Sequence, residues 1–252
     1  MLKYSQVMKM NSYTKFAALY DGLMNSDINY NIWADYIENL FDLYGKNPKL
    51  VCDLACGTGN MTIPLAHRGY DMIGVDRSYD MLAIAREKAP EVTFLCQDMK
   101  KLDLYGSCDA FLCMIDGFNY ILNPNSLYKI AKRIKTCFLE PDGLFVFDLS
   151  SRFKLESFIG NNTFIHDGDE VFYAWENKYH KNLDMCEMYL NFFVKEKNAY
   201  KRFGERHMQR AYSEEEIRRI FLAAGFESVD AYTPLTFDKP KEDDMRIVFV
   251  AK

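Results

Sequence analysis

The stretch from residue 50 to residue 150 alternates short apolar runs with amphipathic segments, and this rhythm limits the possible folds more than any other feature. The apolar runs LVCDLAC, DMIGVD, VTFLCQD, DAFLCMID and LFVFDLS predict buried strands, and PDG before the last run predicts a turn. SYDMLAIAREKAP and NSLYKIAKRIKTCFL have helical periodicity. Strands that alternate with helices form a doubly wound, mostly parallel sheet. We therefore predict an α/β fold.

Two other patterns flank this core. Residues 1–45 contain two segments with helical spacing, YTKFAALYDGLM and NIWADYIENLFDLYG. Between residues 161 and 210, three segments alternate with period two, which predicts a small antiparallel sheet inserted into the core. A capping box from Ser213 to Glu216 opens a later helix, and MRIVFVAK is the closing strand. We expect a helical segment over 1–45, a core over 46–160 and 211–252, and an insertion over 161–210.

Composition excludes several classes of protein. The 252 residues include 31 basic and 36 acidic side chains, and a net charge of −5 disfavours nucleic acid or anionic membrane as the main partner. Seven cysteines are scattered without a CxxC pair, which predicts free thiols in a reducing cytoplasm and no metal site. The start of the chain lacks the apolar core of a signal peptide, and no run approaches the length of a membrane span. We therefore expect a cytoplasmic protein.

A glycine turn follows the first predicted strand of the core. The strand carries Asp53 and leads through Gly57-Thr58-Gly59 into a helix, and Asp76 ends the next strand. Bare backbone at a helix start favours a carboxylate or phosphate. An acid at the tip of the second strand can accept hydrogen bonds from ribose hydroxyls. This pattern predicts a nucleoside ligand with a negatively charged end, although the glycines by themselves could form only a tight turn.

Two cofactor classes fit such a turn. A dinucleotide requires a third glycine where this chain has Thr62, and it lacks the cationic amino group that the carboxylate of Asp53 would suit. S-adenosylmethionine carries an amine, a carboxylate, a ribose and a sulfonium. It therefore fits the pattern better than NAD, and an NAD-dependent oxidoreductase is the least favoured alternative.

Five segments then show a family resemblance in order and spacing: DLACGTGN (53–60), IGVDRSYDMLAIAREK (73–88), FLCQDM (94–99), FDLS (147–150) and EEEIRRIFLAAGF (214–226). They resemble class I S-adenosylmethionine-dependent methyltransferases. A looser similarity links the chain to bacterial small-molecule members with an inserted antiparallel sheet, several of which are amino-sugar or amino-acid N-methyltransferases. The resemblance implies a seven-stranded Rossmann-like sheet, an N-terminal helical lid, and in-line methyl transfer to nitrogen or oxygen of a small molecule.

The resemblance also implies which residues surround the cofactor. The methionine end would lie against Asp53, Ala55, Gly57 and Gly59, and the ribose hydroxyls against Asp76. The adenosine would lie against Arg77, Met81, Asp98 and Met99, and the transferable methyl group above Cys113 and Met114. Tyr13 and Tyr30 correspond to lid aromatics that close over the methionine part, and Tyr20 and Trp33 are nearby candidates. The structural alternatives are that Asp76 only neighbours a helix cap at Ser78, and that Cys113 and Met114 only fill the strand core.

The acceptor side is expected where the fourth predicted strand of the core ends, because ligands lie at the carboxyl ends of parallel strands. Asp116, Asn119 and Tyr120 follow that strand, and His207 lies in the third strand of the insertion. Tyr120, His207 and Asp116 are the candidate catalytic residues, and Asp148 and Arg206 are candidates comparable to His207. The alternative functions are an RNA methyltransferase, disfavoured by net charge and by a missing Asn/Asp-Pro-Pro-aromatic box, and a non-catalytic S-adenosylmethionine-binding module.

Overall fold

The computed structural model describes residues 28–252, so Tyr13, Tyr20 and the first predicted helix lie outside the described residues. Seven strands form one sheet in the order β10-β11-β5-β4-β1-β2-β3. Strands β1 to β5 pair in parallel, and β11 runs antiparallel to both β5 and β10. The strands are β1 (Leu50–Leu54), β2 (Asp71–Asp76), β3 (Thr93–Cys96), β4 (Cys108–Cys113), β5 (Leu139–Ser150), β10 (Val229–Tyr232) and β11 (Arg246–Ala251). The predicted fold class is confirmed.

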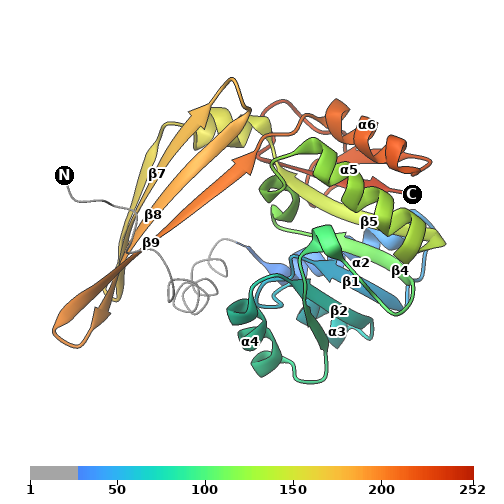
Figure 1. Cartoon of the computed structure of the whole chain (residues 1–252), viewed down its shortest axis with the longest axis horizontal. Coiled ribbons are helices and arrows are strands. Elements are labelled where there is room, and N and C mark those ends of the chain that lie inside the picture. Colours follow the sequence, from blue (N-terminus) through green and yellow to red (C-terminus); the bar gives the residue numbers. More distant parts are fainter. Residues whose placement is uncertain (1–27) are drawn as a thin grey trace.

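Helices cover both faces of this sheet, as Figure 1 shows. Helices α5 and α6 pack against the face that carries Phe111, Phe145 and Phe147. Helices α2 and α3 pack against the other face, which carries Val51 and Leu112. The α-helices are α2 (Tyr30–Leu43), α3 (Thr62–His67), α4 (Tyr79–Lys88), α5 (Pro124–Arg133) and α6 (Glu214–Ala224). The short 3-10 helices are η1 (Met99–Lys101) and η2 (Gly117–Tyr120), and the short π-helices are η3 (Ile134–Phe138) and η4 (Phe153–Phe158).

The helix starts agree with their sequence signals. Ser213 Oγ accepts a hydrogen bond from the Glu216 backbone N–H at 3.1 Å, which is one half of the predicted capping box, whereas the Glu216 carboxylate accepts a hydrogen bond from Arg210 at 2.9 Å. Ser78 Oγ caps α4 in the same way through Met81 N–H. These caps satisfy backbone donors that the first helical turn would otherwise leave without a partner.

Part of the predicted lid forms a layer of the core instead of a separate cover. Ala34, Ile37 and Leu40 of α2 are fully buried against the sheet. Helix α2 therefore contributes directly to the stability of the α/β core. A lid that closes over the cofactor stays a prediction, because residues 1–27 lie outside the described part of the chain.

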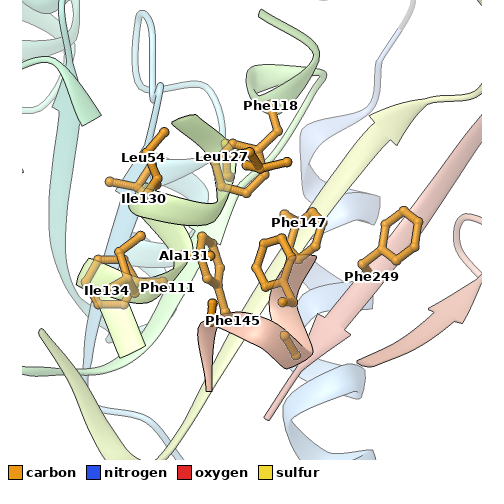
Figure 2. Close-up of a cluster of buried hydrophobic side chains, with 14 of the residues drawn as sticks. Leu54, Phe111, Phe118, Leu127, Ile130, Ala131, Ile134, Phe145, Phe147 and Phe249 are labelled. Carbon is orange, nitrogen blue, oxygen red and sulfur yellow. The ribbon is translucent and has the colours of Figure 1, made fainter. Parts of the chain in front are cut away.

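An aromatic cluster joins β5, β11 and α6 to the segment that follows β4 (Figure 2). The ring of Phe147 stacks on those of Phe221 and Phe249, with centroid distances of 4.5 Å and 5.2 Å. Phe118, in η2, packs edge-on against Phe147 at 5.2 Å and is fully buried. The cluster therefore anchors η2 on the sheet, beside the carboxyl end of β4.

A second, antiparallel sheet projects to one side of the core (Figure 1). Its strand order is β6-β7-β8-β9, with β6 (Thr163–Asp167), β7 (Val171–His180), β8 (Met185–Glu196) and β9 (Ala199–Arg210). The alternation of the sequence predicted β7, β8 and β9. It missed the short edge strand β6, in which four of the five residues are exposed and the apolar signal is weak.

Two further details differ from the sequence prediction. The predicted PDG turn is part of one long strand, β5, and its pairing with β4 shifts register between Cys108 and Ala110. The extra residues form an irregularity near the N-terminal end of β5 and do not break the strand. Strand β10 was not predicted, because its four residues, VDAY, are too few for a periodic pattern. None of the described helices combines the length and the apolar character needed to cross a lipid bilayer.

The aromatic cluster predicts a large stability effect for one substitution. We expect Phe147→Ala to lower the free energy of unfolding by about 3–5 kcal/mol, because it removes a fully buried ring and leaves a cavity. Tyr105→Ala, at a fully exposed ring, is the control and should change it by less than about 0.5 kcal/mol. Urea denaturation followed by circular dichroism measures both, and equal small effects would contradict the prediction.

Candidate functional site

A cavity of about 210 Å³ lies at the carboxyl edge of the parallel strands. Residues that follow β1, β2, β3 and β4 line it together with one side chain from the inserted sheet. They are Ala55 and Gly57 after β1, Val75 to Ser78 and Met81 around the end of β2, Gln97 to Lys100 after β3, Ile115, Gly117, Tyr120 and Ile121 after β4, and His207 of β9. This is the edge at which open α/β sheets bind ligands.

Asp76 joins the tips of β1 and β2 in the floor of the cavity. Its Oδ2 accepts a hydrogen bond from Gly57 N–H at 3.0 Å, and its Oδ1 accepts one from Ser78 N–H at 2.7 Å. Burial raises the pKa of this carboxyl, and the two backbone donors partly offset the rise. Each carboxylate oxygen keeps a further lone pair, so the group can also accept hydrogen bonds from a ligand.

Two positions of the turn adopt backbone conformations that favour glycine, and the two glycines serve different purposes. Gly57 has φ +56° and Gly59 has φ +79°, in the left-handed region that side chains disfavour. A Cβ atom at Gly59 would also lie 3.2 Å from Ile63 and 3.3 Å from Phe94. Gly57 exposes its backbone to the cavity, whereas Gly59 lets α3 and β3 pack tightly behind the turn.

Asp53 lies behind this turn and is not among the residues that line the cavity. Its Oδ2 accepts a hydrogen bond from Thr62 Oγ1 at 2.6 Å. Burial raises the pKa of Asp53 to about 7, although the Thr62 hydroxyl opposes the rise. Thr62, which stands at the third position of the glycine pattern, is thus the partner of the buried acid.

The structure brings the four predicted adenosine residues together. Arg77, Met81, Asp98 and Met99 all line the cavity. Asp98 Oδ1 also accepts a hydrogen bond from Lys100 N–H at 2.9 Å and caps η1, which holds the loop after β3 in place. Their roles toward a cofactor stay predictions.

Three predicted cofactor residues lie in the hydrophobic core instead of on the cavity wall. Cys113 packs on the α5 and α6 side of the sheet, while Met114 and Tyr30 pack on the α2 side. Burial raises the pKa of the Cys113 thiol well above its ordinary value, so this thiol stays protonated. None of these three is among the described residues that line the cavity, and Tyr30 lines a separate cavity beside Asn60 and Ile63.

Tyr120 and His207 meet at the cavity although 87 positions separate them. The Tyr120 hydroxyl lies 3.3 Å from His207 Nδ1, within hydrogen-bond distance, and the two rings pack edge to face at 5.9 Å. Burial lowers the pKa of His207, and the charge of Arg77 lowers it further. The imidazole is therefore mainly neutral at pH 7 and can accept a proton.

Asp116 has a different environment from the other two candidate catalytic residues. Its Oδ1 accepts hydrogen bonds from Ser150 Oγ at 2.8 Å and from the Arg246 guanidinium at 2.6 Å. Burial alone would raise the pKa of Asp116, but Arg246 and Lys154 more than offset it, so the pKa lies well below the ordinary value. An ionised, ion-paired carboxylate of this kind is a poor general base, and a catalytic role for Asp116 stays a prediction.

The other acceptor-side candidates also have structural partners. Asn119 is fully buried, and its Nδ2 donates to the carbonyl oxygens of Ser150 at 3.1 Å and Arg210 at 2.9 Å. It therefore joins η2 to both β5 and the end of β9. Asp148 is buried beside Arg246, and Arg206 donates to Glu187 at 2.6 Å within the inserted sheet.

Some cavity residues were missed by the sequence reasoning. Gln97 and Ile121 line the cavity, and so do Ile115 and Gly117 directly after β4. Their position directly after a parallel strand could have predicted them as cavity residues, because the carboxyl ends of parallel strands lie at one edge of the sheet. A Cβ atom on Gly117 would lie 2.6 Å from Cys113 Sγ. The backbone at Gly117 therefore lies closer to β4 than a residue with a side chain would allow.

Comparisons with known proteins agree with this geometry. A family model described as a methyltransferase domain matches residues 51–143. A protein of Geobacillus sp. (strain WCH70) that bears the name methyltransferase is 32% identical over 247 residues, covering 96% of this chain and 99% of its own. YqeM of Bacillus subtilis (strain 168), also named a methyltransferase, is 31% identical over 95% of this chain and 96% of its own.

Solved structures extend the comparison. An S-adenosylmethionine-dependent methyltransferase from Clostridium acetobutylicum is 35% identical with a TM-score of 0.87, covering 96% of this chain and 99% of its own. The sugar N-methyltransferase KedS8 from Streptoalloteichus shares the fold, with a TM-score of 0.78 and 18% identity over 100% of this chain and 98% of its own. The chain belongs to the class I S-adenosylmethionine-dependent methyltransferases. It is thus an enzyme whose cofactor is S-adenosylmethionine.

The geometry around Asp76 predicts a loss of cofactor affinity. We expect Asp76→Asn to weaken binding of S-adenosylhomocysteine by about 10- to 100-fold, because hydrogen bonds to a charged group contribute about 1.5–3 kcal/mol. Isothermal titration calorimetry measures this directly. Asp71→Asn, at the exposed opposite end of the same strand, is the matched control. Unchanged affinity in a folded Asp76→Asn variant would contradict a ribose role.

The raised pKa of Asp53 predicts a pH-dependent stability difference. Since the folded pKa of about 7 exceeds the ordinary 3.8, the contribution of this carboxyl is most favourable below pH 3.8 and is lost as pH rises to about 7. We expect Asp53→Asn to unfold with a larger free energy than the wild type above pH 7, by on the order of 4 kcal/mol. Near pH 4 the two proteins should be almost equally stable in urea, and a pH-independent difference would refute the interpretation.

Proposed function

We propose that this methyltransferase transfers the methyl group of S-adenosylmethionine to a nitrogen or oxygen atom of a small molecule by in-line displacement. The observation that carries the proposal is the Tyr120–His207 pair, which lies on the wall of the cavity that also contains Asp76 and Asp98. A neutral imidazole and a phenol beside a nucleoside-sized cavity suit a small nucleophile that must be oriented and deprotonated.

The residues of the cavity fit the cofactor. Asp76, already held by Gly57 and Ser78, would accept hydrogen bonds from the ribose hydroxyls, and Asp98 and Met99 would contact the adenine. Gly57 leaves open space where a side chain would stand, which suits close approach of the methionine end. When bound, S-adenosylmethionine supplies a methyl group on a cationic sulfur.

The chain's own contribution to the chemistry would be orientation and proton removal. His207, neutral at pH 7, would accept a proton from an amine or hydroxyl, and the Tyr120 hydroxyl would orient the imidazole or the acceptor. Most of the rate enhancement would come from holding the acceptor in line with the methyl group in a site that excludes water. Asp116 would stabilise this wall through its ion pairs instead of moving a proton.

Charge and fold support a small acceptor. The net charge of −5 disfavours a polyanionic substrate, and the fold is shared with the sugar N-methyltransferase KedS8. An amine-bearing small molecule is therefore the first class to test. The seven free cysteines support a reducing, cytoplasmic location.

A transfer screen tests the proposal. The enzyme is incubated with methyl-labelled S-adenosylmethionine and panels of amines, amino sugars, small acids and RNA, and label is followed into each product. We expect transfer to a small nucleophile. Salt-sensitive transfer to RNA alone would establish the RNA-directed alternative, and cofactor binding without transfer to any panel would favour a binding module.

With an acceptor from that screen, His207 can be tested as a base. We expect His207→Gln to lower kcat/KM by about 10²- to 10⁴-fold. Because its pKa is lowered, the wild-type rate should hold as pH falls to 6.5 and decline only below it, as His207 becomes protonated. His67→Gln, on the exposed side of α3, is the control. An unchanged pH–rate profile in His207→Gln would exclude this role.

A further inference from the structure

The segment that carries Tyr120 begins with an unusual backbone. Ile115 and Asp116, directly after β4, have φ values of +58° and +69°. Both are non-glycine residues in the left-handed region, and a β-branched residue such as isoleucine is rarely found there. Such conformations are energetically unfavourable and persist only where the surroundings impose them.

A buried ion-pair cluster surrounds the side chain of Asp116. The Arg246 guanidinium lies between two carboxylates: it contacts Asp116 Oδ1 at 2.6 Å and donates to Asp148 Oδ2. Lys154 Nζ lies 3.7 Å from Asp116 Oδ2, and Ser150 Oγ donates to Asp116 Oδ1. The Arg246 side chain is only 13% exposed and that of Asp148 is fully buried. Two acids and two bases thus meet where β4, β5, β11 and η4 come together.

The strained residues connect this cluster to the cavity over a very short distance in the chain. Asp116 C=O accepts a hydrogen bond from Asn119 N–H at 3.0 Å, which closes the η2 turn. Phe118 is held in the aromatic cluster, and Asn119 is held by Ser150 and Arg210. Tyr120 is then the last residue of η2 and contacts His207. Little freedom remains between the carboxylate of Asp116 and the ring of Tyr120.

We propose that Arg246 is a positioning residue that aims Tyr120 at His207 by holding Asp116 and the η2 turn. Its importance to catalysis rests on the proposed function, but the positioning itself does not. Arg246 starts β11, which is 126 residues beyond Tyr120 and contributes no side chain to the cavity wall among the described residues. It acts through Asp116 and does not touch the reacting groups.

Arginine is suited to this role and lysine only partly. A guanidinium presents several donors in a fixed plane, so it can hold two carboxylates at once, whereas an ammonium is a single point charge. The Arg246 guanidinium also lies 6.0 Å from the ring of Trp33 in α2, a contact that an arginine plane favours. Arg246→Lys should therefore keep the positive charge but only part of the contact geometry that holds Asp116 and Asp148.

The titration of His207 reports the position of Tyr120 without any knowledge of the acceptor. Among the described residues, the Tyr120 hydroxyl lies within hydrogen-bond distance of this imidazole, and the charge of Arg77, at the tip of β2, acts on it. If Tyr120 moves away, water enters around His207 and its pKa returns toward the ordinary 6.5. Nuclear magnetic resonance of labelled histidines follows each of the four histidines separately, with the His207 signal assigned from His207→Gln.

We expect Arg246→Met to raise the titration midpoint of His207 by at least about half a pH unit, and Arg246→Lys to raise it less. Arg68→Met is the matched control, since Arg68 also bridges two carboxylates, Asp35 and Glu38, at 2.5 Å and 3.0 Å, but lies between α2 and α3. An unchanged midpoint in folded Arg246→Met would overturn the proposal, and so would an equal shift in Arg68→Met.

If Arg246→Met does not fold, Asp116→Asn takes its place, because it breaks the same ion pair from the other side. The same upward shift is expected, and its absence in the folded variant would overturn the proposal. The outcome is independent of the transfer screen. A shift of the His207 midpoint without methyl transfer to any acceptor would retain the positioning role of Arg246 and reject the small-molecule function. Methyl transfer to a small molecule without such a shift would retain the proposed function and reject the positioning role.

Discussion

The hydrogen bonds that Asp76 accepts from the backbone of Gly57 and Ser78 are the constraint on which the site depends. They join the ends of two neighbouring strands and orient the glycine turn, so that its bare backbone faces the cavity. Burial disfavours the charge of this carboxylate, and the two donors compensate only in part. The group therefore has unused capacity to accept hydrogen bonds, which is the property a nucleoside site needs.

The opposite wall of the cavity is held by a different kind of interaction. Phe118 is anchored by stacking and edge contacts with the rings of the core, while Asp116 is anchored by charge. Apolar burial stabilises the turn, and the ion pairs define its conformation, because buried charges tolerate few arrangements. The fold thus uses its hydrophobic core to stabilise this turn and its buried polar groups to orient it.

Much of the fold and the grouping of residues at the cavity could be predicted because both follow from local patterns. Strand and helix periodicity gave the doubly wound sheet, and the rule that parallel strands end at one edge brought Gly57, Asp76 and Asp98 together. The prediction failed for β6 and β10, which are too short or too exposed to show a period. It also missed that PDG continues β5, since only pairing with β4 reveals the register shift.

The amino-acid sequence by itself determined the class of fold, the glycine turn and the family, because these depend on residue type and on spacing along the chain. Only the tertiary structure decided which polar groups act together. Nothing near Tyr120 in the chain specifies His207 as its neighbour, and nothing near Asp116 specifies Arg246. Such partners come from strands that are distant in sequence and meet at one edge of the sheet, so their pairing is a property of packing and not of any local pattern.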